Sequence, residues 1–219
     1  MNTICFIDDS EFEHDLVRHE IAPRAPDFEF VQAYTFKEAA VDLGTKIPGL
    51  FLLDLWGKDE DVREPYLSPR EELKAETAKF KTLDDVYEGL ENFKGDIANE
   101  YLKRFFGIVD SWRSLFEKVC DRIGQNSKYG LSNLRQVRKY YPGVPAVFYT
   151  RKSLIRDAVA MFHAGADGLF IKPTGSDDAE TRRLTGEYAP QLIMQLEKII
   201  RAKGRITEML QNTPTCSRE

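Results

Sequence analysis

Four short apolar runs along the chain each end in polar residues. The runs are Ile4–Ile7, Leu50–Leu53, Ala146–Tyr149 and Gly168–Ile171. Apolar runs of this length, bounded by polar or turn-forming residues, are typical of strands that are buried on both faces of a parallel sheet. Residues Phe28–Ala33, which follow two prolines, predict one more strand, the second in chain order. The pattern therefore predicts five strands.

Amphipathic segments separate these strands. The apolar spacing after Ser10 predicts a helix as far as Ile21, with Ser10 as its N-cap. Thr35 is the expected N-cap of a second helix that ends near Leu43, and further helices are expected on both sides of the fourth strand. A last helix is expected from Leu192 to Ile200, and it can extend to Leu210. Five strands that alternate with helices predict an α/β fold, a doubly wound parallel sheet with strand order 2-1-3-4-5.

The alternation stops at residues 58–127. This segment has no strand-like run, is rich in charged residues and has predicted helix starts near Ser68 and Thr82. From Ile97 to Ile123, apolar residues recur at steps of three and four, which predicts one long amphipathic helix. We expect a discontinuous domain of residues 1–57 and 128–205, a helical insertion of residues 58–127, and a partly disordered C-terminal extension of residues 206–219.

The composition indicates a soluble globular protein. Hydrophobic residues make up 42% of the 219 positions and charged residues 31%. No apolar stretch reaches the roughly 20 residues of a membrane helix, and three cysteines without metal-type spacing indicate reduced thiols. A cytoplasmic protein with no membrane partner is therefore expected. The net charge of −5, with 12 Lys/Arg against 16 Asp/Glu in the insertion, disfavours a nucleic-acid partner.

Reactive polar residues follow the ends of the predicted strands. Asp8 and Asp9 follow the first strand and Asp54 the third, while Thr150 and Lys172 end the fourth and fifth. Because ligands bind outside the carboxyl ends of parallel strands, we expect these five side chains to form one site. Clustered carboxylates repel one another by about 4 kcal/mol per pair at 4 Å. A divalent cation relieves this repulsion, and an all-oxygen ligand set suits Mg²⁺.

With these residues in this order, the chain resembles the receiver domain of two-component response regulators. The resemblance also includes Pro173 and the stretch Ala164–Gly168 before the last strand, and it covers about residues 1–56 and 128–203. It implies a flavodoxin-like receiver fold with a helical insertion after the third strand. It also implies a phosphoacceptor that receives its phosphoryl group from a histidine kinase or a phosphotransfer protein.

The resemblance assigns a role to each residue of the site. Asp54 is the expected phosphoacceptor, a nucleophile that attacks phosphorus to form an acyl phosphate. Asp8, Asp9, Asp54 and the backbone carbonyl of Trp56 are the expected Mg²⁺ ligands. Lys172 is expected to offset charge on the transferred group, and the Thr150 hydroxyl to bond a phosphoryl oxygen. Only phosphorylation and dephosphorylation of the chain itself are expected, so we do not classify it as an enzyme.

Three positions depart from the family pattern or affect access to the site. Arg151 stands after Thr150, where the family usually has a small residue, and Leu169 stands where it usually has an aromatic switch residue. Trp56, two residues after the acceptor, is expected either to slow hydrolysis of the acyl phosphate or to pack against the insertion. The histidines, His14, His19 and His163, are expected to be solvated or capping residues away from the site.

The expected output is binding through the insertion, either as a homodimer or to an unidentified downstream protein. One alternative is a receiver-like interaction module that is not phosphorylated because Arg151 blocks the phosphodonor. Another is a phosphohydrolase of the haloacid-dehalogenase type with Asp54 as nucleophile. This second alternative is disfavoured because Trp56 occupies the position where such enzymes need a second Asp.

Overall fold

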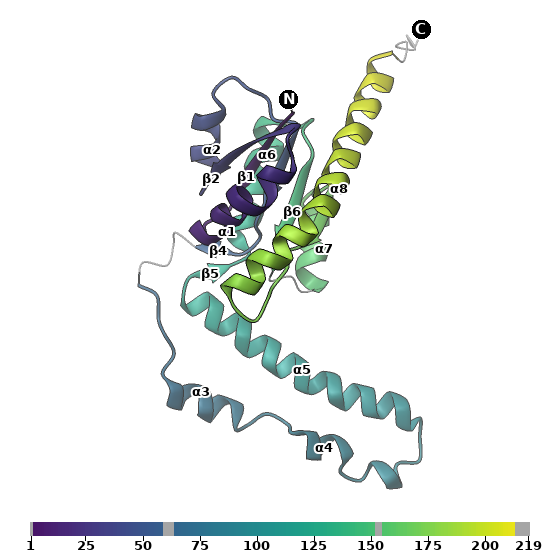
Figure 1. Ribbon diagram of the computed structural model, residues 1–219. Coiled ribbons are helices and arrows are strands. Elements are labelled where there is room, and N and C mark those ends of the chain that lie inside the picture. Colours follow the sequence, from purple (N-terminus) through teal and green to yellow (C-terminus); the bar gives the residue numbers. More distant parts are fainter. Residues whose placement is uncertain (1, 59–63, 152–154, 213–219) are drawn as a thin grey trace. The chain divides into compact units, whose positions relative to one another are not determined.

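The computed structural model describes residues 2–58, 64–151 and 155–212 (Figure 1). The chain divides into two compact units. One unit, called here the sheet unit, comprises Met1–Lys58 and Ser127–Glu219, and the other, the insertion, comprises Asp59–Asn126. Each unit is described by itself. Among the described residues, no helix combines the length and apolar character that a membrane span requires.

The sheet unit is built on a five-stranded parallel sheet. The strands are arranged in the order β2-β1-β3-β6-β7, which confirms the predicted fold class and order. Their bounds are β1 Asn2–Ile7, β2 Phe28–Ala33, β3 Leu50–Leu53, β6 Ala146–Thr150 and β7 Gly168–Ile171. In the register of the central strands, Ile7 lies opposite Leu53 and Leu53 opposite Phe148. The carboxyl ends of these strands therefore lie level with one another.

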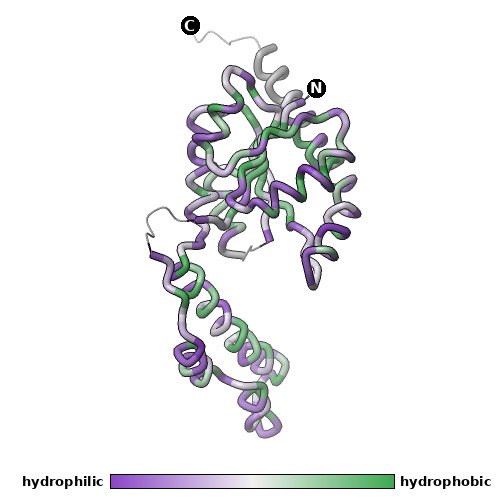
Figure 2. The backbone as a smooth tube through the Cα atoms, turned by 60° about the vertical axis from the view of Figure 1, so that its left-hand side comes forward, coloured by the Kyte–Doolittle hydropathy of each residue, from purple (hydrophilic) through white to green (hydrophobic). Residues whose placement is uncertain are grey.

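Helices cover both faces of this sheet. The side chains of one face form an apolar cluster with residues of the first and last helices of the unit. This face includes Ile4, Phe6, Leu50, Leu52 and Val147. On the opposite face, Phe51 packs against Phe36 and Tyr141, with ring centroids 6.4 and 5.1 Å away. Alternate residues of each strand thus enter different cores, and Figure 2 shows the apolar positions concentrated in the strands.

The helices of the sheet unit follow the strands in alternation. Their bounds are α1 Glu11–Leu16, which continues as the π-helical η1 Val17–Ile21 and the 3-10 helix η2 Ala22–Arg24, then α2 Phe36–Leu43, α6 Lys128–Tyr140, α7 Ile155–His163 and α8 Asp178–Asn212. Thr35 caps α2 as predicted, because its side chain accepts a hydrogen bond from the Glu38 amide. Ser10 occupies the N-cap position of α1 as predicted, but its side chain makes no capping hydrogen bond.

Two further expectations need correction. The last strand, β7, lies at the edge of the sheet, where Ile171 is 51% exposed, so it is not buried on both faces. The last helix begins at Asp178 rather than Leu192, because the carboxylate of Asp177 accepts from the Glu180 amide and caps its first turn. The predicted disorder of the extreme C-terminus falls on residues 213–219, which lie outside the described residues.

The insertion contains one long helix and several short elements. Its helices are α3 Arg70–Thr77, α4 Leu83–Tyr87, the 3-10 helix η3 Leu90–Asn92 and α5 Ile97–Arg122. Thr82 forms a capping box with Asp85 at the start of α4. Two strands of two residues each were not predicted, because such short strands carry no alternating pattern. They are β4 Gly57–Lys58, which belongs to the sheet unit, and β5 Gln125–Asn126 in the insertion.

A close backbone contact sets where α6 starts. Gly130 donates its amide to the Leu55 carbonyl at 3.0 Å. A Cβ atom at this position would lie 2.4 Å from the Asp54 carbonyl oxygen and 2.6 Å from Leu55 Cα. Only glycine therefore allows α6 to approach the backbone that carries Asp54 this closely.

We expect Gly130→Ala to lower the free energy of unfolding of the sheet unit by about 2 kcal/mol or more, because the added methyl meets rigid backbone. The matched control is Gly204→Ala in α8, where a Cβ has no neighbour within 4 Å. This control should leave stability unchanged or raise it by up to about 1 kcal/mol. Urea unfolding of both variants measures the difference, and equal stabilities would contradict the close contact.

Candidate functional site

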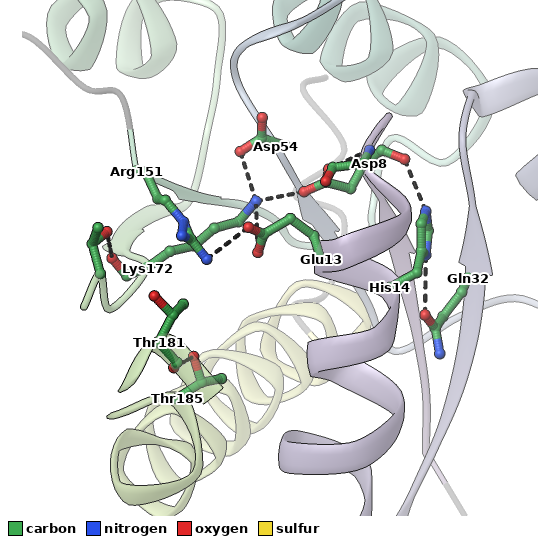
Figure 3. Close-up of polar contacts among 11 residues, drawn as sticks. Asp8, Glu13, His14, Gln32, Asp54, Arg151, Lys172, Thr181 and Thr185 are labelled. Atoms are coloured by element: carbon green, nitrogen blue, oxygen red, sulfur yellow. Dashed lines mark hydrogen bonds and ion pairs between the residues drawn. The ribbon is translucent and has the colours of Figure 1, made fainter. Parts of the chain in front are cut away.

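The carboxyl ends of β1, β3 and β7 bring Asp8, Asp54 and Lys172 together (Figure 3). Lys172 Nζ lies 2.5 Å from Asp8 Oδ2 and 3.0 Å from Asp54 Oδ1. The contact follows from the sheet register, since Ile7 lies opposite Leu53 and the next residue of each strand is an aspartate. All three side chains are buried, and Lys172 is 4% exposed. An ion cluster this deep depends on each charge having a partner.

Asp9 completes a group of three carboxylates. Ligand atoms of Asp8, Asp9 and Asp54 all lie within 4.8 Å of one another. Asp8 accepts a hydrogen bond from the Ser10 amide at 2.9 Å, and Asp9 accepts one from the Lys58 amide at 2.8 Å. These bonds hold the carboxylates in place although their charges repel. Hard oxygen ligands at this spacing fit a divalent cation such as Mg²⁺.

Thr150 ends β6 beside this cluster. Its carbonyl accepts a hydrogen bond from the Lys172 amide at 3.0 Å, and Thr150 is 1% exposed. Within the described part of the chain, the Thr150 hydroxyl has no hydrogen-bond partner of normal geometry. A buried hydroxyl without a partner costs free energy. At this position it is a donor available to a further group at the site.

Two charged residues extend the site beyond the strand ends. Glu13, on α1, is 8% exposed, and its Oε2 lies 3.4 Å from Lys172 Nζ. Its other oxygen lies 2.7 Å from Arg151 Nη2. Arg151 Nε and Nη2 are buried and lack an aligned hydrogen-bond acceptor among the described residues, so the contact with Glu13 is an ion pair of poor hydrogen-bond geometry. Figure 3 shows Glu13 between the two cations.

Sequence reasoning missed Glu13. The available signal was its position four residues after Asp9, one helical turn into the helix that follows the first strand. A carboxylate in the first turn of a helix is common, because the helix dipole favours it. The sequence alone therefore gave no reason to assign Glu13 to the site.

The prediction for His14 was wrong. This side chain is 2% exposed, and its Nε2 donates to the Asp8 carbonyl at 2.9 Å. Its Nδ1 lies 3.0 Å from Gln32 Oε1 on β2. His14 thus ties the backbone of Asp8 to the neighbouring strand. His19 and His163 are exposed, as expected.

Tyr129 closes the same edge from α6. It donates from its hydroxyl to the Tyr34 carbonyl at 2.6 Å, and its ring fills the space next to Gly57. Burial, with the charges of Asp8, Asp9 and Asp54, raises its pKa, so Tyr129 stays neutral. Trp56 is buried with 6% exposure. Its carbonyl as a metal ligand stays a prediction.

Burial and charge act against each other in the cluster. Burial alone lowers the pKa of Lys172, but the charges of Asp8, Asp54 and Glu13 more than offset this, so its pKa is raised and it stays protonated. Burial raises the pKa of Asp8. It also raises the pKa of Asp54 to about 6, although Lys172 lowers it. The Thr150 hydroxyl lowers the Asp54 pKa further, so it lies near that carboxylate despite lacking an aligned hydrogen bond.

No protein-family model matches the chain, and no curated protein sequence matches it significantly. Solved structures do match it. NtrX from Brucella abortus superimposes with a TM-score of 0.52 at 17% identity, over 100% of this chain and 31% of that one. This chain therefore spans about a third of NtrX. A CheY-like response regulator receiver domain protein from Methanospirillum hungatei JF-1 gives a TM-score of 0.43 at 15% identity, over 90% and 98% of the chains.

The similarity to NtrX, with a TM-score above 0.5, shows the fold alone. The sheet unit has a five-stranded parallel sheet in the order β2-β1-β3-β6-β7 with helices on both faces, which is the flavodoxin-like fold that the sequence predicts. The helical insertion between β3 and α6 is additional to that fold.

The raised pKa of Asp54 predicts a pH-dependent cost to stability. Its pKa is about 6 in the folded protein against its usual 3.8, so between these values the folded state binds protons more readily than the unfolded state. The free energy of unfolding of the metal-free protein should therefore fall as pH rises from about 4 to 7. We expect Asp54→Asn to remove this dependence and to raise stability at pH 7 by on the order of 1–3 kcal/mol.

Thermal unfolding in EDTA at several pH values measures this effect. Asp27→Asn, at an exposed position, is the matched control and should change little. Millimolar Mg²⁺ should raise the melting temperature of the unmodified protein more than that of Asp54→Asn, because the cation neutralises the buried Asp54 carboxylate, which the variant lacks. If Asp54→Asn were less stable than the unmodified protein in EDTA at pH 7, the charged Asp54 carboxylate would not be destabilising.

Proposed function

We propose that this protein is a signalling receiver whose Asp54 accepts a phosphoryl group from a histidine kinase or phosphotransfer protein in a Mg²⁺-dependent reaction. The observation that carries the proposal is the buried contact of Lys172 with both Asp8 and Asp54 in a receiver fold. The proposed chemistry is phosphorylation and dephosphorylation of the chain itself, in the cytoplasm, without turnover of another substrate.

The side chains supply the parts of a phosphoryl transfer. An oxygen of Asp54 forms the new bond to phosphorus as the phosphorus–nitrogen bond of the donor phosphohistidine breaks, and the imidazole leaves with the electron pair and takes a proton from water. Lys172 balances charge on the equatorial oxygens, and the Thr150 hydroxyl donates to one of them. Asp8, Asp9, Asp54 and the Trp56 carbonyl would hold Mg²⁺, which supplies further positive charge at these oxygens.

Arg151 has a separate role in this proposal. Phosphorylation replaces the single charge of Asp54 by a phosphoryl group with a charge near −2. We assign Arg151 as a second cation that turns from Glu13 to a phosphoryl oxygen. The support is its poorly aligned pair with Glu13 and its buried nitrogens without acceptors. An arginine suits this task because its guanidinium presents several donors to one anion.

The proposed output is protein–protein binding through the insertion. Its helix α5 leaves several large apolar side chains exposed, among them Phe106 and Trp112 at 60% and 53%. Large exposed apolar side chains that gather in one region typically mark a binding surface. The net negative charge of the insertion favours a protein partner over nucleic acid.

Incubation with acetyl phosphate or phosphoramidate and Mg²⁺ should add the mass of one phosphoryl group to the intact protein. Asp54→Asn should abolish the addition, whereas Asp27→Asn should retain it. Mass spectrometry of the intact proteins provides the measurement. An unchanged addition in Asp54→Asn would place the acceptor elsewhere. No addition to the unmodified protein, together with no binding of beryllofluoride, would favour the non-phosphorylated interaction module.

The role of Arg151 predicts opposite effects for two substitutions. Arg151→Ala should weaken beryllofluoride binding about 10-fold or more, because a charge-assisted hydrogen bond is lost. Glu13→Gln should strengthen it, because it frees Arg151 and removes a negative charge 3.4 Å from Lys172. Titration of Trp fluorescence in Mg²⁺ measures both affinities. If Arg151 instead blocks the donor, Arg151→Ala should bind beryllofluoride more tightly than the unmodified protein.

A further inference from the structure

Helix α5 carries an exposed apolar seam with regular spacing. Its members are Leu102, Phe105, Val109, Trp112 and Phe116, which follow one another at steps of three, four, three and four. Each is between 39% and 53% exposed. Alternating steps of three and four place the side chains on one stripe and are the spacing of helices that pair along their length. Figure 2 shows apolar positions recurring along this helix.

A neighbouring face of α5 packs within the insertion. Leu115 is buried, and Tyr101 lies tilted against Tyr87 of α4 with ring centroids 5.6 Å apart. Arg104 donates to the carbonyls of Val86 and Glu88 at 3.2 and 2.7 Å. At 100° per residue, Leu115 and Arg104 lie more than a quarter turn from Val109 at the centre of the seam. The seam therefore adjoins the face that α3 and α4 cover. Trp112 contacts Phe80 with ring centroids 5.4 Å apart and Phe105 stacks on Tyr101 at 6.2 Å, yet both seam residues remain partly exposed.

The size of the seam fits a helix pair between two copies of the chain. Aromatic side chains present about 150–250 Å² each. With the observed exposures, and including Phe106 beside them, the seam residues leave on the order of 500 Å² accessible. A standard protein interface buries about 800 Å² on each partner. The seam supplies most of this area, and the polar side chains at its edge supply the rest.

Charges beside the seam favour an antiparallel arrangement. Lys103 and Glu117 lie on the same side of the seam, seven residues before and after Asp110. In an antiparallel pair centred near Asp110, Lys103 of each copy lies level with Glu117 of the other, which gives two opposite-charge contacts against one like-charge contact between the two Asp110 side chains. In a parallel pair, each of these residues meets its own equivalent, which repels.

We propose that α5 pairs with α5 of a second copy in an antiparallel helix pair, with the seam as the buried interface. The proposal rests on the proposed role of the insertion as a binding surface and names its partner. Because a twofold axis relates the two helices, each seam residue is used on both copies.

Sedimentation of the full-length protein from 1 to about 100 µM tests the proposal. We expect a dimer, and we expect Val109→Glu to weaken it at least about 100-fold, because it buries two unpaired charges in the interface. Val41→Glu, at a position on α2 that is 75% exposed, is the matched control and should remain dimeric. Circular dichroism checks that both variants retain their helices.

A charge exchange tests the orientation. Lys103→Glu should weaken the dimer about 5- to 10-fold, and the double change with Glu117→Lys should restore it, because the double change reverses both opposite-charge contacts. A monomer throughout the concentration range, or a dimer that survives Val109→Glu, would overturn the proposal. Loss without restoration in the double variant would overturn the antiparallel arrangement. Phosphoryl mass addition, measured on the same variants, separates failure of the dimer from failure of the acceptor site.

Discussion

The buried ammonium of Lys172 is the interaction on which the arrangement of the strand ends depends. It is held by Asp8, Asp54 and Glu13, and Glu13 in turn holds Arg151. With Asp9, the six side chains carry four negative and two positive formal charges. The excess of two negative charges is the charge that one divalent cation neutralises. Without the cation, burial raises the pKa values of Asp8 and Asp54, and a neighbouring carboxylate, Glu13 for Asp8 and Asp8 for Asp54, adds to the effect.

The backbone maintains this unfavourable cluster. The pairing of β1 with β3 fixes Asp8 and Asp54 as neighbours, and the Lys172 amide bonded to the Thr150 carbonyl fixes the end of β7 against β6. His14 ties the Asp8 carbonyl to β2, while Gly130 lets α6 approach the Asp54 carbonyl. Packing of the sheet on both faces supplies the stability that offsets the strain of the site, as is usual for functional sites.

The strands and their polar ends were predictable because both signals are local. A short apolar run followed by Asp, Thr or Lys places that side chain at the sheet edge wherever the rest of the chain lies. Glu13, His14 and Tyr129 were not predictable in this way. Each reaches the site from a helix, and the direction in which a helix side chain points depends on how the helix packs, which a single sequence does not specify. The start of the last helix was also not predictable. It was expected at Leu192, because the polar first turn that Asp177 caps carries no apolar pattern.

We expect the proposed phosphorylation to affect other parts of the sheet unit through the charge of the phosphoryl group, and not through rotation of an aromatic side chain. Leu169 stands where the resemblance calls for an aromatic switch, so that device is absent from this position. Arg151 and Arg182 both contact the ring of Phe12, with their guanidinium carbons 5.8 and 5.2 Å from the ring centroid. Arg182 also forms an ion pair with Asp15 at 3.8 Å. Movement of Arg151 away from Glu13 would therefore remove a cation from Phe12 of α1 and change the packing between α1 and α8. A continuous set of contacts thus connects the charged cluster at the strand ends to the helix pair that covers one face of the sheet.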